Sequence, residues 1–112
     1  MRLIMCSCAS EMAQMVAETL IERRLTSLVN TVPQARRTYL TGEYEMRTEE
    51  RTLLFIHSME EKLEEIISSL VEILDESAPP IVSMELFEGA ERYVSWAEDF
   101  LDPFDPPDLS EE

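Results

Sequence analysis

The sequence predicts a single α+β domain, with the order strand, helix, strand, strand, helix, strand and one further helix at the end. Two segments have apolar residues at three- and four-residue steps, which is typical of amphipathic helices. Four other segments have the composition and length of strands. The chain has 112 residues, 45% of them hydrophobic, so it is long enough for one core and is not expected to be disordered.

The first strand is expected over residues 2–8, an apolar run bounded by small residues. Ser10 is expected to cap the helix that follows, because its hydroxyl can accept a hydrogen bond from a free backbone N–H. Apolar residues at helical spacing run from Met12 to Ile21. The helix is expected to end near residues 23–24, two arginines whose positive charge suits a helix C-terminus.

A long hairpin is expected next. Residues 25–41 lack a helical period and have a strand-like composition, so they are predicted to form a strand. Pro33 has no N–H to donate to a neighbouring strand, which predicts a bulge or bend there. Gly42 marks the turn into a partner strand over residues 44–57. The polar stretch 46–51 of that strand is expected to be exposed or irregular.

The second helix is expected to begin at a capping-box sequence, Ser58-Met59-Glu60-Glu61. In such a box, Ser58 and Glu61 would each accept a hydrogen bond from the other's backbone N–H. The following Pro79 and Pro80 stop the helix. Its predicted buried residues recur at helical spacing: Leu63, Ile66, Ile67, Leu70 and Leu74.

The last third of the chain is predicted to contain a fourth strand over residues 81–87, ended by Gly89, and a short helix over residues 90–101. Residues 102–112 hold three prolines and five carboxylates, a composition typical of a disordered tail. We therefore expect one domain over residues 1–101 and a disordered tail after it. The inward residues of the last helix are predicted to be Tyr93, Trp96, Ala97 and Phe100.

This order of elements predicts a ferredoxin-like β-α-β-β-α-β sandwich, a four-stranded antiparallel sheet with two helices on one face. The other sheet face carries apolar side chains and no helix of this chain. The two long strands also exceed what one subunit can pair. Further copies of the chain are a physical way to cover both the apolar face and the unpaired edges.

Acidic residues dominate the charge: 24 Asp and Glu against 9 Lys and Arg give a net charge of -15. Such a surface repels nucleic acid and anionic membranes, so neither is expected as a partner. No segment has the roughly 20 apolar residues that a membrane span needs, and no signal peptide is recognisable. The protein is therefore expected in the cytoplasm.

Five motifs follow one another over nearly the whole chain short of the tail. The first strand ends in Cys6-Ser7-Cys8-Ala9, and the other motifs are IERRLTSLVNTVP at 21–33, GEYE at 42–45 after Tyr39, LLFIHS at 53–58 and GAERYVSW at 89–96. In order and spacing they resemble the motifs of the CutA family, small trimeric proteins linked to divalent-cation tolerance. The first of them is similar to the family's C-T-C/A-P segment.

The resemblance implies a PII-like homotrimer that is not an enzyme, takes part in tolerance of divalent metal ions such as copper, and binds a metal ion or small ligand in clefts between subunits. Two differences from the family fall at this cleft: LDES at 74–77 replaces H-P-Y-E, and a tryptophan near Thr41 is missing. A ferredoxin-like regulatory domain or enzyme that uses the same cleft for a small molecule is the alternative. The implied cleft residues are Tyr39, Asp75, Glu76 and Trp96.

Cys6 and Cys8 allow three interpretations. Residues i and i+2 of a strand share a face, so two thiolates could bind one soft ion such as Cu(I) or Zn(II), with His57, a carboxylate or another subunit completing the site. Free cysteines are also common as small buried apolar residues, and we favour this packing interpretation, because no pair of histidines accompanies the motif. A redox pair ranks third, and a disulfide between them would close almost no loop.

Three other residues have weaker signals. A strand-end histidine is more often solvated or hydrogen-bonded than a ligand, so His57 is a weak metal candidate. Arg36 and Arg37 are expected to point to opposite faces of their strand. We favour solvation for both, and the alternative is that one of them binds a carboxylate of another subunit or an anionic ligand. The sequence contains no recognisable catalytic motif, and we expect no enzyme activity.

Overall fold

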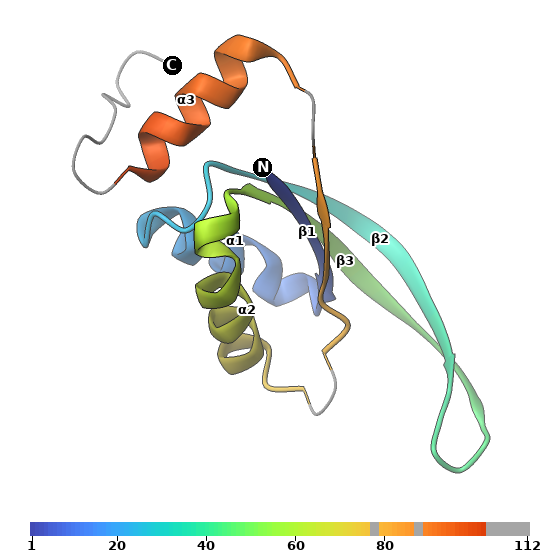
Figure 1. The fold of residues 1–112 in the computed structure, drawn as a ribbon. Coiled ribbons are helices and arrows are strands. Elements are labelled where there is room, and N and C mark those ends of the chain that lie inside the picture. The colour runs from blue at the N-terminus through green and yellow to red at the C-terminus, as the bar shows by residue number, and fades with distance from the viewer. Residues whose placement is uncertain (77–78, 87–88, 103–112) are drawn as a thin grey trace.

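The computed structural model describes residues 1–76, 79–86 and 89–102. Four strands form one antiparallel sheet in the order β2-β3-β1-β4, and helices α1 and α2 lie against one of its faces (Figure 1). These connections and this strand order are those of a ferredoxin-like fold, as the sequence predicts. None of the helices in the described ranges has the length and hydropathy of a membrane span.

Strand β1 (Arg2–Cys8) leads through a 3-10 turn, η1 (Ser10–Met12), into helix α1 (Ala13–Glu22). The predicted cap is wrong: the N-cap residue of α1 is Met12, and no side chain caps η1 or α1. Ser10 instead accepts a hydrogen bond at 2.9 Å from the hydroxyl of Thr52. The helix ends close to where it was expected, and Arg24 just beyond it has a left-handed φ of 59°.

Strands β2 (Leu28–Leu40) and β3 (Met46–Ser58) form the long hairpin. Their register shifts between Val32 and Ala35, which confirms the bulge predicted at Pro33. The turn lies where Gly42 predicts it, although the left-handed φ belongs to Tyr44. Residues 46–51 are a regular and mostly exposed part of β3, so of the two alternatives the exposed strand is confirmed.

Helix α2 (Glu60–Leu74) is present as predicted, but its capping box is wrong. The N-cap residue is Met59, and no side chain bonds the first turn. Ser58 is fully buried at the end of β3, where its hydroxyl donates to the backbone carbonyl of Leu25. The helix buries Ile66, Leu70 and Leu74 and packs Leu63 against the core as its spacing predicts, whereas Ile67 is half-buried.

Strand β4 (Val82–Glu85) pairs with β1 and is exposed along its whole length. It is shorter than predicted, and Phe87, the expected last residue, lies outside the described residues. Helix α3 (Glu91–Leu101) buries Ala97, Phe100 and Leu101, while Tyr93 and Trp96 are half-buried. Residues 103–112 also lie outside the described ranges, so the disordered tail and the domain boundary stay predictions.

The two faces of the sheet differ in what covers them. On the face under α1 and α2, Ile4, Cys6 and Cys8 of β1 join Leu54 and Ile56 of β3 in the hydrophobic core. The opposite face, called here the open face, carries the alternate residues of the same strands. Four of its large apolar side chains are between 38% and 59% exposed: Met5, Val32, Val82 and Met84.

The hairpin reaches well beyond the rest of the sheet (Figure 1). Pairing between β1 and β3 ends at Cys8 and Thr52, whereas β2 and β3 remain paired as far as Leu40 and Met46. The molecule is accordingly long, with extents of 51 × 27 × 23 Å. Residues 35–51, called here the distal hairpin, therefore form a two-stranded ribbon within one chain.

Candidate functional site

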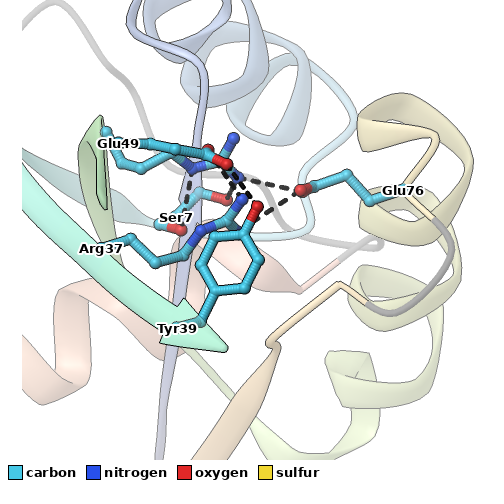
Figure 2. Close-up of polar contacts among 6 residues, drawn as sticks. Ser7, Arg37, Tyr39, Glu49 and Glu76 are labelled. Carbon is cyan, nitrogen blue, oxygen red and sulfur yellow. Dashed lines mark hydrogen bonds and ion pairs between the residues drawn. The ribbon is translucent and has the colours of Figure 1, made fainter. Parts of the chain in front are cut away.

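A chain of ion pairs links β2, β3 and the segment after α2 (Figure 2). Arg37 lies between two carboxylates: its Nη2 is 3.0 Å from Glu49 Oε2, and its Nη1 is 3.4 Å from Glu76 Oε1. Arg51 Nη2 is 3.0 Å from the second oxygen of that carboxylate, Glu76 Oε2. We call these four residues the arginine–glutamate cluster.

Strand register brings three of the four residues together. Arg37 is opposite Glu49, and Ala35 is opposite Arg51, so the three charged side chains project from one face of the distal hairpin. The bulge sets this register, because it inserts an extra residue into β2 just before Ala35. Without it, Arg36 rather than Arg37 would lie opposite Glu49, since a slip of one residue moves every side chain to the other face.

Glu76 reaches the cluster because α2 ends early. The helix stops at Leu74, well before Pro79 and Pro80, which were expected to stop it. Its C-cap residue, Asp75, has the left-handed conformation (φ 51°, ψ 41°) that ends helices and turns the chain away from the helix axis. The next side chain, that of Glu76, then contacts both arginines.

Arg51 is the most buried member of the cluster, with 8% of its surface exposed. Its Nη2 donates to the backbone carbonyl of Ser7 at 3.0 Å, and its Nε donates to Ser7 Oγ at 3.3 Å. A guanidinium is costly to bury unless its donors are paired. Arg51 therefore joins the end of β1 to β3 and, through Glu76, to the end of α2.

Tyr39 extends the cluster along β2. Its hydroxyl donates to Glu49 Oε1 at 2.6 Å, and its ring centre lies 5.2 Å from the Arg37 guanidinium carbon, within the range of a cation–π contact. The hydrogen bond from Tyr39, followed by that from Arg37, holds the pKa of Glu49 below its ordinary value. Glu49 is therefore ionised at neutral pH.

Comparison with known proteins identifies the family. Residues 2–99 match the family model described as CutA1 divalent ion tolerance protein. The chain belongs to the CutA1 family. No individually curated protein matches the sequence.

Solved CutA structures share the fold of this CutA1-family chain. CutA from Xylella fastidiosa aligns with a TM-score of 0.85 at 22% identity, over 90% of this chain and 97% of that chain. The periplasmic divalent cation tolerance protein CutA from Archaeoglobus fulgidus aligns at 0.84 and 18% identity, over 91% and 100% of the two chains. The divalent cation tolerance protein from Thermus thermophilus aligns at 0.80 and 23% identity, over 87% and 95%. The expected CutA fold is thus confirmed.

The structure brings together two of the four implied cleft residues. Tyr39 and Glu76 meet at the arginine–glutamate cluster, joined by Arg37 and Glu49. Asp75 is exposed at the end of α2. Trp96 lies on α3, where its ring stacks on Phe100 with 5.4 Å between the ring centres.

Cys6 and Cys8 both lie in the hydrophobic core, 2% and 0% exposed, as the packing interpretation predicts. Burial raises the pKa of Cys6 to about 12, and burial also raises the pKa of Cys8. Both thiols therefore stay protonated at neutral pH, whereas a metal ion binds the thiolate. Within the described ranges, no three His, Cys, Asp or Glu side chains are arranged to hold a metal ion.

His57 is a hydrogen-bonded strand-end histidine, one of the two forms expected for it. Its Nδ1 lies 2.8 Å from the hydroxyl of Tyr93, which lies 3.2 Å from Ser27 Oγ. The two rings meet edge to face, with 5.7 Å between their centres. Burial lowers the pKa of His57. These contacts attach α3 to the end of the sheet.

Sequence reasoning missed Ser7, Glu49 and Arg51, and its expectation that Arg37 is solvated is wrong. The contact between Arg37 and Glu49 depends on the register in which β2 and β3 pair. Knowing from the sequence that a bulge lies at Pro33 does not by itself give that register. The alternation of side chains along β3 could have pointed to Arg51. It places Arg51 on the same sheet face as the apolar Leu53, and a guanidinium in apolar surroundings needs hydrogen-bond or ion-pair partners.

Proposed function

We propose that this CutA1-family protein is a homotrimer that takes part in the response to divalent metal ions, copper among them. It binds a metal ion or a small ligand in clefts between subunits and catalyses no reaction. The family match over residues 2–99 supports the role in ion tolerance. The distal hairpin is the structural observation that supports the assembly most directly.

The distal hairpin has little to stabilise it within one chain. A two-stranded ribbon alone is marginally stable in water. Three large apolar side chains at its tip are exposed: Leu40 by 54%, Tyr44 by 84% and Met46 by 70%. Packing this ribbon and the apolar open face against other copies would bury both, and a closed ring of copies leaves no free surface of this kind. Three is the number of copies that the resemblance to the family implies.

A cleft between subunits would combine residues from opposite ends of the sheet. Tyr39 and Glu76 gather with Ser7 at the C-terminal end of β1. Helix α3, which carries Trp96, is attached through His57, which lies opposite the N-terminal part of β1. Within one subunit, Tyr39 and Glu76 therefore lie far from Trp96. In the assembly, Trp96 of a neighbouring subunit would face Tyr39 and Glu76 across one cleft.

Carboxylates are the donors that this cleft offers a metal ion. Asp75 is exposed and adjoins Glu76 at the end of α2. Cys6 and Cys8 fit the role less well, because both thiols are buried and protonated. We therefore place the proposed metal at Asp75, with Glu76 as a second ligand that would exchange an arginine partner for the metal ion. His57 is a weaker candidate, since its Nδ1 is engaged with Tyr93.

Sedimentation equilibrium combined with Cu(II) and Zn(II) titration tests the proposal. We expect a trimer, with metal binding that is lost in an Asp75→Asn, Glu76→Gln variant and kept in Glu72→Gln, a matched change on the exposed side of α2. It should also be kept in a Cys6→Ser, Cys8→Ser variant. A protein that stays monomeric contradicts the assembly, and metal binding lost only with the cysteines moves the site to the thiols.

For the compartment, we propose the cytoplasm. Neither cysteine is in a disulfide, which suits a reducing environment. The relative from Archaeoglobus fulgidus is described as periplasmic. Cell fractionation with an antibody against the protein distinguishes the two locations.

A further inference from the structure

Both oxygens of the Glu76 carboxylate are already engaged by arginines. Its Oε1 lies 3.4 Å from Arg37 Nη1, and its Oε2 lies 3.0 Å from Arg51 Nη2. A divalent cation and a guanidinium repel each other, so an ion can bind this carboxylate closely only where an arginine moves away. Metal binding at Asp75 and Glu76, on which this inference rests as part of the proposed function, is therefore an exchange of partners.

Arg51 is the arginine that cannot easily be exchanged. It is 8% exposed, and it is held in place by hydrogen bonds to the carbonyl and the hydroxyl of Ser7. Among the described residues, Glu76 is the only carboxylate within ion-pair distance of Arg51. If Glu76 moved away, a buried guanidinium would lose its counter-ion, which is costly.

Arg37 can release Glu76 at a lower cost. Its contact with Glu76 is the longer of the two, and its side chain is 27% exposed, so water can replace the lost acceptor. Glu49 remains 3.0 Å from the other terminal nitrogen, Nη2, and the ring of Tyr39 still faces the guanidinium. Arg37 therefore keeps a counter-ion and a fixed position after Glu76 has left it.

We propose that Arg37 competes with the metal ion for Glu76 and thereby sets the metal affinity of the site. Without metal, Glu76 Oε1 accepts from Arg37; with metal, this oxygen binds the ion and Arg37 is paired with Glu49 alone. Breaking the ion pair lowers the affinity below that of the same carboxylates without Arg37. Such a site stays empty when ions are scarce and fills when they are in excess, which suits a tolerance response.

The sign of the effect distinguishes this role from a supporting one. If Arg37 only held Glu76 in position for the metal, its removal would weaken metal binding. If Arg37 competes, its removal strengthens metal binding. A positive charge removed elsewhere also favours a cation slightly, so a control must remove the same charge without touching Glu76. Arg36 is that control, because it is exposed and adjoins Arg37 on the other face of β2.

Zn(II) affinity, measured by competition with a chromophoric chelator at one pH and at 0.15 M salt, tests the proposal. Arg37→Met should bind Zn(II) at least about fivefold more tightly than the unaltered protein. Arg36→Met should stay within about twofold, because salt screens the exposed charge. Weaker binding by Arg37→Met, or an equal gain in both variants, overturns the proposal.

A second measurement uses the unaltered protein and so does not depend on the folding of a variant. In ¹⁵N NMR of arginine side chains, Zn(II) should shift the guanidinium signals of Arg37 saturably and leave those of Arg51 nearly in place. Shifts confined to Arg51, or absent from both, overturn the proposal.

Failure of this inference and failure of the proposed metal site give different results. If the unaltered protein binds neither Zn(II) nor Cu(II), the metal site fails, and the competition by Arg37 fails with it. If binding is lost in the Asp75→Asn, Glu76→Gln variant but Arg37→Met binds as the unaltered protein does, the metal site stands and only the competition is wrong.

Discussion

Arg51 Nη2 lies 3.0 Å from Glu76 Oε2, and this ion pair fastens the segment after α2 to β3. Exposed ion pairs typically contribute about 0–1 kcal/mol to stability. Arg51 is 8% exposed and also bonds the Ser7 carbonyl, so its loss would leave that carbonyl without this donor and would leave Glu76 paired with Arg37 alone. This pair should therefore matter more than a surface ion pair.

Arg51→Met should lower the free energy of unfolding by about 2–4 kcal/mol, because it removes the hydrogen bonds to Ser7 and one of the two ion pairs of Glu76. Glu76→Gln should cost less, about 1–2 kcal/mol, since an amide oxygen can still accept from Arg51. Denaturant unfolding followed by circular dichroism, at one protein concentration, measures both.

Arg47→Met is the matched control, and it should change stability by less than about 0.5 kcal/mol, because Arg47 is exposed. The double variant of Arg51 and Glu76 completes a thermodynamic cycle. A coupling energy near zero would show that the two residues act independently in spite of their distance.

Tyr39→Phe should raise the pKa of Glu49 towards its ordinary value, because it removes the hydrogen bond that does most to lower it. A carboxylate with a depressed pKa stabilises the fold above its unfolded-state pKa, and this contribution is lost as the pH falls through the folded-state pKa. The variant should therefore lose less stability on acidification than the unaltered protein. Carboxyl ¹³C NMR titration gives the pKa directly. Tyr44→Phe, at a residue that is 84% exposed, should leave it unchanged.

His57 should make the protein less stable as the pH falls. Burial lowers its pKa, so the unfolded chain takes up a proton at a higher pH than the folded one does. Stability therefore declines as the pH drops from the ordinary histidine value, about 6.5, to the lower folded-state pKa, and this contribution is constant below it. The difference in unfolding free energy between the unaltered protein and His57→Gln measures it. A difference that does not vary with pH would contradict this prediction.

Cys6 and Cys8 should react with a thiol reagent such as Ellman's reagent only when the protein opens. Both thiols are buried, so the reagent cannot reach them in the native state. Burial also raises both pKa values, so neither sulfur is present as the reactive thiolate. The reaction rate should rise in parallel with unfolding as denaturant is added. Fast reaction of one thiol in native buffer would revive the metal and redox interpretations for that residue.

Features that depend on residues close together in the chain were predicted from the sequence, and features that depend on distant residues were not. The helical spacing of Ile66, Leu70 and Leu74 and the missing donor of Pro33 are local properties, and the predictions from them are confirmed. The hydroxyls of Ser10 and Ser58 fit local capping patterns, but each bonds a distant partner instead. Tertiary hydrogen bonds thus replaced both caps.

The candidate site was harder to predict, because its contacts join residues far apart in the chain. Glu76 lies 25 positions from Arg51 and 39 from Arg37. Family resemblance pointed to Tyr39 and Glu76, but nothing local marks Arg51 or Ser7 as their neighbours. Their meeting depends on the register that follows the one-residue bulge and on the early end of α2 at Asp75, and the sequence patterns predicted neither.

The distal hairpin offers the decisive test of the proposed trimer. Leu40 and Met46 are directly paired near its tip and are 54% and 70% exposed. Replacing both by glutamate should leave the core intact, because neither side chain belongs to it. If the tip packs against another subunit, two buried charges should dissociate the trimer into folded monomers at micromolar concentration. Sedimentation equilibrium gives the mass, and circular dichroism checks the fold. Glu43→Gln and Glu45→Gln, on the same turn, are the controls and should leave the assembly intact. A double-glutamate variant that still forms trimers would remove the hairpin tip from the interface and leave the apolar open face as the remaining candidate.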